Sequence, residues 1–510
     1  MHSYLLGLDI GTTGTKSVVF DEKGRVVSKS YREYKLYHRE PHLSELDPRE
    51  VWESIKYVLR ESVSNAKLRP NEIKAVSTAV LGEAFIPVDR EGEPLYWSMT
   101  TYDARAAKQV KLWEDNFGSK EIFKISGQPL SAKMPYYTLQ KIQWIRENEF
   151  EIFRKTWKFL CWEDYFNFKL TGKCVTDYTI ATRTMMFDIH KKKWSKEILD
   201  LAGIDEDLLP EVKPPGQMIG VVSEKASKET CLGTRTLVVT GGHDQACGAL
   251  GAGILEEGKL MDATGTTECY AMVQDKLVLN DKMRRQGYSV NVYVLQDKYF
   301  MFGGTPTSGS VLRWFRDKFA HEEQKKASEE GRDVYDLLID EASKAEIGSL
   351  NLFFYPYFEG SGTPAVNRDA RGAIIGLTLA HNKGDILRAI LESLAFELRR
   401  NIETFRNYGF KINEIRVTGG GAKSPFWVQL KADVTKIDVL VPEAKMETTA
   451  LGAAILTTRE AQIYKTFNEA ALHMSRLPEK YEPESDKGKL YDEIYGKYLK
   501  LQKRLLKFYA

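Results

Sequence analysis

The chain has 510 residues, of which 43% are hydrophobic and 28% charged, and its formal net charge at pH 7 is +2. This balance gives no sign of a nucleic-acid or anionic-membrane partner, and the length exceeds one ordinary core, so we expect two large domains. No apolar run is long enough for a membrane span, and the chain enters a strand near its N-terminus without a signal peptide. Five scattered cysteines without a Cys-x-x-Cys pair predict free thiols in a reducing cytoplasm and no zinc site.

The N-terminal segment is predicted to form a β-hairpin whose turn could bind a phosphate group. An apolar strand ends at Asp9, passes through Gly11, Thr12 and Thr13, and returns as a second strand. Small residues in such a turn let backbone N–H groups and threonine hydroxyls approach phosphate oxygens, and Asp9 could hold a hydrated Mg²⁺. A plain β-turn is the alternative interpretation.

Three polar residues follow in otherwise apolar surroundings. Gly82-Glu83 comes directly after a strand over residues 73–78, and Glu83 is either a surface charge or a group that hydrogen-bonds a substrate. Asp103 forms a Tyr-Asp-Ala-Arg cluster with Arg105, which fits a structural ion pair as well as a binding role. Tyr136 precedes an amphipathic helix and is either a core residue or a hydroxyl donor to a ligand.

The segment 237–250 is the centre of the functional interpretation. An apolar β-branched strand ends at Gly241-Gly242, and a helix begins near Asp244. Such a turn lies at the edge of a sheet beside a helix N-terminus, where phosphate-bearing ligands bind. Asp244 could therefore accept a proton from a hydroxyl that attacks a phosphoryl group. Asp at a helix N-cap is the alternative.

The second half of the chain repeats parts of this pattern. A second Gly-Thr-Thr, Gly265-Thr266-Thr267, lies between two apolar runs and suggests a duplication with a nucleotide held between the halves. A glycine-rich loop enters a helix that contains Gly309 and Arg313. A strand then runs into Gly419-Gly420-Gly421 before a helix capped by Ser424, which makes a close-approach site wide enough for a flat base. Residues 449–457 form a small-residue helix that we expect to pack close to a sheet.

These motifs together resemble the actin/sugar-kinase ATPase superfamily, and two further stretches resemble the FGGY carbohydrate kinases. Residues 136–148 are similar to the first FGGY signature through Lys141, Trp144 and Asn148. Residues 372–392 are similar to the second signature. The resemblance covers nearly the whole chain. It implies an α/β fold of two actin-like (ribonuclease H-like) domains, residues 1–245 and 246–510, each with a mixed five-stranded sheet flanked by helices and with the active site in the cleft between them.

The resemblance also implies the chemistry, which is ATP-dependent transfer of a phosphoryl group to a sugar or polyol hydroxyl with Mg²⁺. Asp244 is similar to the family's catalytic base, and Asp9 and Asp244 to its metal-binding carboxylates. The residues expected to bind ATP are Gly11, Thr12, Thr13, Gly265, Thr266, Thr267, Gly309, Arg313, Gly419, Gly420, Gly421 and Ser424. Those expected to bind substrate are Gly82, Glu83, Asp103, Tyr136, Asp244 and Gln245. Ser424 stands where some members have Asn.

The pocket residues favour a neutral substrate. Gly82 leaves space, and Glu83 and Asp103 offer acceptors to hydroxyls. No cation is visible in this part of the pocket to pair with a carboxylate, which argues against gluconate unless Arg105 or Arg183 folds into the pocket. A ketopentose such as xylulose is the best expectation, with gluconate, glycerol and erythritol as alternatives.

Two other functional classes compete with a kinase. A non-catalytic sugar-responsive regulator would use the same fold, but it would have no need of a base such as Asp244. A chaperone-like or filament ATPase shares the superfamily fold, but it would not carry both FGGY signatures. A homodimer is an open alternative to a monomer.

Overall fold

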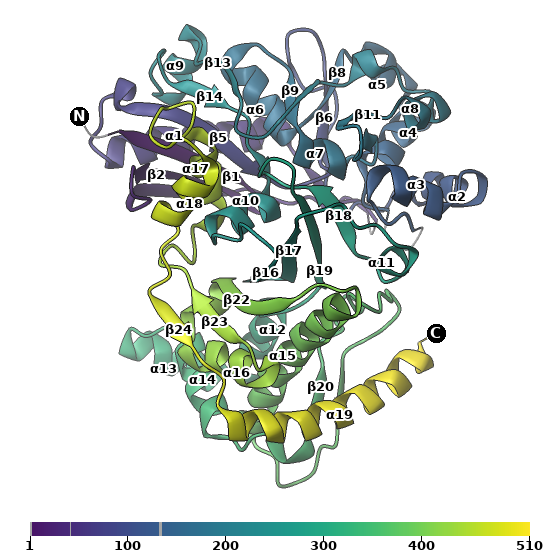
Figure 1. The fold of residues 1–510 in the computed structure, drawn as a ribbon, viewed down its shortest axis with the longest axis vertical. Helices are drawn as coiled ribbons and strands as arrows, with labels where there is room; N and C mark the ends of the chain where they lie inside the picture. The colour runs from purple at the N-terminus through teal and green to yellow at the C-terminus, as the bar shows by residue number, and fades with distance from the viewer. Residues whose placement is uncertain (1–2, 41, 132–134, 510) are drawn as a thin grey trace.

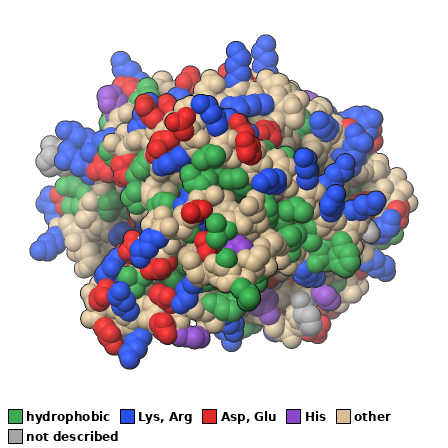
Figure 2. Space-filling model, turned by 90° about the horizontal axis from the view of Figure 1, so that it is seen from below, with side chains coloured by type: hydrophobic (Ala, Val, Ile, Leu, Met, Phe, Trp, Pro, Cys, Tyr) green, Lys and Arg blue, Asp and Glu red, His purple; other side chains and the backbone are tan. Residues whose placement is uncertain are grey.

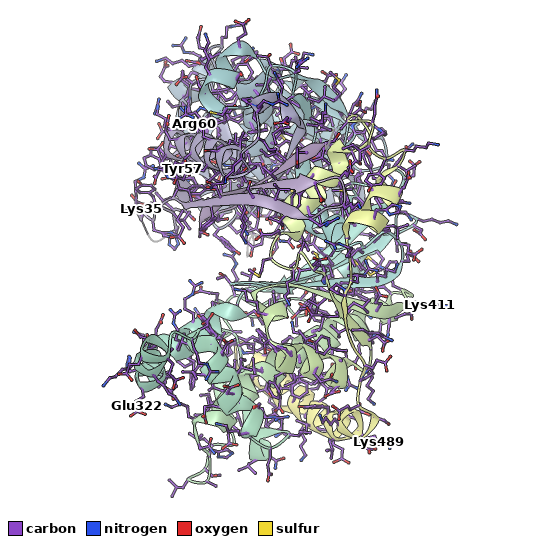
Figure 3. All side chains as sticks on the ribbon, turned by 90° about the vertical axis from the view of Figure 1, so that its left-hand side faces the viewer. Lys35, Tyr57, Arg60, Glu322, Lys411 and Lys489 are labelled. Carbon is purple, nitrogen blue, oxygen red and sulfur yellow. The ribbon has the colours of Figure 1, made fainter. Side chains whose placement is uncertain are left out.

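The computed structural model describes residues 3–40, 42–131 and 135–509. Two α/β units lie one above the other, each built on a seven-stranded sheet (Figure 1). In side view, Lys35 and Tyr57 lie on the upper unit, whereas Glu322 and Lys489 lie on the lower one (Figure 3). Seen from below, acidic and basic side chains are interspersed around hydrophobic ones (Figure 2). None of the helices in the described part of the chain has the length and apolar character of a membrane span.

The upper sheet has the strand order β13-β14-β5-β1-β2-β3, and β15 also pairs with β5. Strands β1, β2 and β3 form an antiparallel meander, whereas β5 runs parallel to β1, and β14 and β15 run parallel to β5. The bounds are β1 (Tyr4–Ile10), β2 (Gly14–Asp21), β3 (Val26–Glu33), β5 (Ile73–Val80), β13 (Met218–Val221), β14 (Leu237–Val239) and β15 (Gly242–His243).

The lower sheet has the order β18-β19-β17-β16-β22-β23-β24. Its bounds are β16 (Gly258–Thr264), β17 (Glu268–Gln274), β18 (Ser289–Val292), β19 (Tyr299–Thr305), β22 (Ile412–Gly419), β23 (Asp438–Val441) and β24 (Glu479–Tyr481). Five strands repeat the order and sense of the upper sheet, with β16 in the place of β1 and β22 in the place of β5. The expected duplication is therefore visible in the topology.

The number of strands differs from the prediction of five in each sheet. The added strands β13, β15, β18 and β24 contain 4, 2, 4 and 3 residues. Strands this short carry too few residues for a periodic hydrophobic pattern, so the sequence does not reveal them.

Helices cover both sheets. Asp47 caps α1 (Pro48–Asn65), and α1 packs on β2 and β3. Further helices are α4 (Thr138–Asn148), α6 (Trp162–Thr171), α7 (Tyr178–Arg183), α10 (Asp244–Gly251), α12 (Gly309–Phe319), α15 (Lys383–Asn407), α16 (Pro425–Thr435), α17 (Thr448–Thr457) and α19 (Ser485–Phe508). A four-stranded sheet of β4 (Glu45–Leu46), β6 (Phe85–Val88), β7 (Ser98–Met99) and β8 (Lys158–Cys161) extends the upper unit.

The small-residue helix α17 belongs to the C-terminal part of the chain but packs on strands β1 and β5 of the upper sheet (Figure 1). A Cβ at Gly7 of β1 would lie 1.9 Å from the Ala450 carbonyl oxygen, and one at Gly452 would lie 1.8 Å from that of Cys247 on α10. Glycine is required at both positions because the backbones are in contact. The prediction that this helix approaches a sheet closely is confirmed.

Candidate active site

The candidate catalytic residues lie where the parallel strands of the upper sheet end. Asp9 is at the end of β1, Glu83 follows β5, and Asp244 follows β15, which pairs in parallel with the last residues of β5. The carboxyl ends of parallel strands meet at one sheet edge, which is where α/β proteins bind their ligands. The topology thus brings three carboxylates from distant parts of the sequence to one edge.

Asp244 is the first residue of α10, and His243, not Asp244, occupies the N-cap position. The alternative of a simple Asp N-cap is therefore wrong. Asp244 Oδ1 accepts a 2.6 Å hydrogen bond from the Gln245 backbone N–H and lies 3.3 Å from His243 Nε2. Burial, and then the negative charge of Asp9, raise the pKa of Asp244 to about 7. A carboxylate with such a pKa is suited to accept a proton near neutral pH.

His243 stays neutral beside this carboxylate. Its ring stacks on Phe302, with centroids 5.6 Å apart, and burial together with the charge of Arg183 holds the pKa of His243 well below its usual range. A neutral imidazole places no positive charge beside Asp244.

The first hairpin turn has the predicted form. The Gly11 N–H donates to the Gly14 carbonyl at 3.0 Å, and the Tyr34 hydroxyl donates to the same carbonyl at 3.1 Å. Thr13 is exposed, and Gly11 and Thr12 are half-buried, so this turn faces away from the core. The turn therefore has the accessibility that a phosphate site needs.

Asp9 and Asp244 fit a magnesium ion. Burial raises the pKa of Asp9 to about 6, while the nearby Lys16 charge lowers it. Its carboxylate oxygens have no hydrogen-bond donor among the described residues, and its charge raises the pKa of Asp244. Mg²⁺ commonly binds one or two carboxylates together with substrate phosphates. Asp9 and Asp244 are two buried carboxylates whose charges interact, which suits such a pair.

The second hairpin turn is attached to a helix N-terminus. The backbone N–H groups of Ser308 and Ser310 donate to the Thr266 carbonyl at 3.0 and 3.2 Å, and that of Gly309 donates to Gly265 at 2.9 Å. A Cβ at Gly309 would lie 2.6 Å from the Gly265 carbonyl oxygen. Gly265 and Thr266 remain exposed. The N-terminus of α12 thus holds one side of the turn, while Gly265 and Thr266 remain exposed on the other side.

A buried ion cluster, which sequence inspection missed, supports this hairpin. Lys431 Nζ on α16 lies 2.5 Å from Asp262 Oδ2, 2.7 Å from Glu268 Oε1 and 2.6 Å from Thr264 Oγ1. Ser308 Oγ donates to Glu268 at 2.9 Å, which ties the cluster to the start of α12. The side chains of Lys431, Asp262 and Glu268 are at most 1% exposed.

The triple-glycine segment approaches the same hairpin. A Cβ at Gly419 would lie 2.6 Å from the Thr264 carbonyl oxygen, and one at Gly421 would lie 2.6 Å from Thr264 Cγ2. Gly420 is exposed. Ser424 caps α16 as predicted, because its Oγ accepts from the Trp427 N–H at 3.2 Å. Arg313 on α12 is also exposed. Gly309, Gly419 and Gly421 therefore lie against the second hairpin.

Glu83 is buried at the substrate end of the site and forms an ion pair. One of its oxygens accepts from Arg183 Nη2, and the other accepts from Thr101 Oγ1 at 2.7 Å. Arg183 also donates to Gln128 and to Ser289. Burial lowers the pKa of Arg183 to about 9, and its Nε has no partner among the described residues. A cation has therefore folded into the pocket.

The space beside Gly82 is already filled. A Cβ at Gly82 would lie 2.8 Å from His243 Cδ2 and 3.4 Å from Arg183 Nε. The prediction that Gly82 leaves room for a substrate is wrong, because the imidazole and the guanidinium occupy that room.

Asp103 is not available to a substrate. Its Oδ1 accepts from the Arg105 backbone N–H at 3.2 Å and from Nε at 2.8 Å, and its Oδ2 accepts from the Ser44 N–H at 2.8 Å and from Arg105 Nη2 at 2.7 Å. Arg105 also pairs with Glu45 at 2.6 Å. Four donors occupy the four acceptor sites of a carboxylate, and Asp103 is 0% exposed. The expected substrate contact is wrong, and the structural ion pair is the correct interpretation.

Tyr136 lies where the two units meet. The guanidinium of Arg368, from the lower unit, lies 5.0 Å from the Tyr136 ring centroid, and the Tyr102 ring packs edge-on at 6.4 Å. Burial, Tyr136 and Asp244 raise the pKa of Tyr102, so these aromatic rings are close to the candidate base. Arg368 has no acceptor or ion-pair partner among the described residues.

Comparisons with known proteins match this geometry. Residues 4–251 match the N-terminal domain of the FGGY family of carbohydrate kinases, and residues 261–461 match its C-terminal domain. The chain belongs to the FGGY family of carbohydrate kinases. It is 30% identical to a gluconokinase of Bacillus subtilis over 99% of this chain and 96% of the relative, and 28% identical to a xylulose kinase of Staphylococcus epidermidis over 98% and 96%.

Solved structures of FGGY kinases have the same fold. A xylulose kinase from Lactobacillus acidophilus superposes with a TM-score of 0.89 at 24% identity, covering 99% of both chains. A glycerol kinase from Plasmodium falciparum gives 0.84 at 23% identity, covering 98% of both chains. The two-domain actin-like fold and the phosphotransferase class are therefore established for this FGGY kinase.

Sequence inspection of this FGGY kinase missed three site features. No role was predicted for His243, although it lies in the Gly-Gly-His-Asp-Gln motif. Its position directly before the predicted base Asp244 was the signal that could have identified it. Lys431 interrupts the apolar face of a helix, which is the pattern of a buried paired charge. Arg368 lies in an irregular loop, where no periodicity indicates which way a side chain points.

Proposed function

We propose that this kinase transfers the terminal phosphoryl group of ATP to a hydroxyl of a small sugar or polyol, with Asp244 as general base. The raised pKa of Asp244 at the sheet edge, opposite Asp9, is the observation that carries the proposal. Asp9 and Asp244 would hold the Mg²⁺, which supplies charge neutralisation on the phosphates when bound. The two hairpin turns provide backbone N–H groups and hydroxyls for those phosphates.

Unpaired polar atoms indicate where the sugar binds. Gln245 Oε1 and Arg183 Nε are buried without partners among the described residues, and they offer one acceptor and one donor beside Asp244. Buried polar groups are normally satisfied, so such atoms in a pocket indicate ligand contacts. Alternating donors and acceptors suit the hydroxyls of a sugar.

A neutral ketopentose such as xylulose is the first candidate substrate. Arg183 is neutralised by Glu83, so the inner pocket presents an ion pair and not a free positive charge. Relatives with similar sequences include xylulose kinases, which agrees with this candidate.

A sugar acid is the second candidate, and Arg368 favours it. The Arg368 guanidinium lies over Tyr136 without an acidic partner among the described residues, and it adds a cation that the sequence did not indicate. A carboxylate at the far end of the substrate could pair with it through two parallel hydrogen bonds. The relationship to gluconokinases agrees with this second candidate.

A coupled ADP-release screen over xylulose, ribulose, glycerol, erythritol, xylitol and gluconate separates the two candidates. If the substrate is gluconate, Arg368→Gln should raise its KM at least about tenfold, because a charge-assisted bidentate pair contributes about 1.5–3 kcal/mol. Arg285→Gln, an exposed arginine of the lower unit, is the matched control. If the substrate is neutral, neither variant should change its KM by more than about twofold. Absence of turnover on all six, with ATP still bound, would favour the sugar-responsive regulator.

A further inference from the structure

The turn that carries Asp244 is held by two hydrogen bonds to buried side chains. The Gly241 backbone N–H donates to Glu163 Oε1 on α6 at 2.8 Å, and the His243 N–H donates to Thr179 Oγ1 on α7 at 2.7 Å. Both acceptors are buried. They fix the backbone on the residues immediately before the candidate base.

The glycines of this turn are also in contact with their surroundings. A Cβ at Gly241 would lie 1.7 Å from the Thr78 carbonyl oxygen of β5, and one at Gly242 would lie 2.9 Å from Thr179 Oγ1. These close contacts oppose movement of the turn toward Thr78 or Thr179. The two hydrogen bonds oppose movement of the turn away from Glu163 and Thr179.

Glu163 and Asp177 join these two anchors into one network. Asp177 Oδ1 accepts from Thr179 Oγ1 and from the Ile180 N–H, both at 2.9 Å, and Oδ2 accepts from the Thr179 N–H at 2.7 Å. The carboxyls of Glu163 and Asp177 interact, because the charge of Asp177 raises the pKa of Glu163. The chain of contacts therefore runs from Gly241 through Glu163, Asp177 and Thr179 to His243.

Burial and the negative charges of Asp177 and Asp164 disfavour the ionised form of Glu163. Both side chains are 0% exposed, and within the described residues no lysine or arginine forms an ion pair with either. Two adjacent carboxylates cannot both be charged in such a site. Asp177 receives three donors and is the charged member, whereas Glu163 receives one, and its Oε2 has no donor facing it. Burial, followed by the charge of Asp177, raises the pKa of Glu163 well above its usual range.

We propose that the neutral Glu163 carboxyl, donating to Asp177 and accepting from Gly241, is a positioning residue that holds the catalytic turn and so sets the place of Asp244. This inference rests on the proposed function, in which Asp244 is the base. Holding a base in register affects the rate of transfer more than the affinity for substrates, because a displacement of about 1 Å can cost about 10²-fold in rate.

Two variants of Glu163 test this role. Gln is isosteric with the neutral acid and can both donate to Asp177 and accept from Gly241, so Glu163→Gln should keep kcat within about twofold of the wild type. Leu offers neither bond, so Glu163→Leu should lower kcat at least about tenfold while KM for ATP and for the sugar stays within about threefold. Rates are expressed per ATP-binding site, which removes any unfolded fraction from the comparison.

A second measurement does not depend on turnover. Hydrogen exchange of the peptide 237–250 should be faster in Glu163→Leu than in the wild type and unchanged in Glu163→Gln. If Glu163→Leu does not fold, Thr179→Val and Thr179→Ser replace the pair, since Val removes the acceptor of the His243 N–H and Ser keeps it.

The outcomes separate this inference from the proposed function. Equal exchange and equal kcat in Glu163→Leu and the wild type would overturn the positioning role. A loss in Glu163→Gln as large as in Glu163→Leu would also overturn it, because it would show that a charge and not a proton is needed. Wild-type protein that turns over none of the six sugars would instead refute the proposed function, while the exchange comparison would still decide the positioning role.

Discussion

The pH dependence of turnover follows from the raised pKa of Asp244. As a base, Asp244 acts only when ionised, so the rate should fall as pH decreases through its pKa of about 7. With that value, about 0.9 of the enzyme is ionised at pH 8 and about 0.1 at pH 6, so kcat/KM should fall about tenfold between them. His243 should not contribute, because its pKa lies well below the usual range.

The assay is coupled ADP release with the sugar that the screen identifies, at concentrations of sugar and MgATP below their KM values, so that the profile reports the free enzyme. Asp244→Asn should lower kcat at least about 100-fold and abolish the acidic limb, since general-base catalysis typically contributes about 10²–10⁴. Asp9→Asn should move the limb of its residual activity to lower pH, because the Asp9 charge raises the pKa of Asp244. A profile that is flat between pH 5.5 and 8, or an Asp244→Asn variant within tenfold of the wild type, would refute the assignment.

Two further predictions concern the scaffold. Lys431→Met leaves Asp262 and Glu268 buried without their cation, so it should destabilise the lower unit by about 3–5 kcal/mol. Differential scanning calorimetry should show this as a lower melting temperature. An unchanged melting temperature would contradict the buried cluster. Gly7→Ala should lower the free energy of unfolding by about 1–3 kcal/mol or more, because the added methyl group overpacks against α17. Gly496→Ala lies in a helix with open space at its Cβ position, so it should be neutral or stabilise the protein by about 0.5–1 kcal/mol. Equal melting temperatures for these two variants would contradict the close backbone approach.

Much of the fold could be predicted because its signals are local. The strand before Asp9, the strand before Gly241 and the helix of small residues over 448–457 are each specified by a run of side chains of one type. Gly241, Gly309 and Gly419 have one physical reason in common, which is the close approach of another backbone. The fold class follows once such elements alternate in order.

The site was harder to predict because the partner of a polar residue is a tertiary property. Asp103 and Glu83 both interrupt apolar sequence, yet one is saturated by Arg105 and Ser44 and the other faces the pocket. Nothing in either local sequence distinguishes them. Spacing can place a residue at a sheet edge, but only packing decides which donors have already reached it.

The close contact between α17 and β1 has a consequence for dividing this protein. The family boundary falls near residue 251, yet the face of the N-terminal sheet is completed by a helix encoded almost 200 residues later. A fragment that ends at residue 251 would present the bare surface of β1 and β5 to water, with glycine backbone at its centre. Such a fragment should aggregate, and it should be rescued by a second fragment that contains residues 448–457. A helix from beyond the family boundary therefore contributes to the packing of the N-terminal sheet.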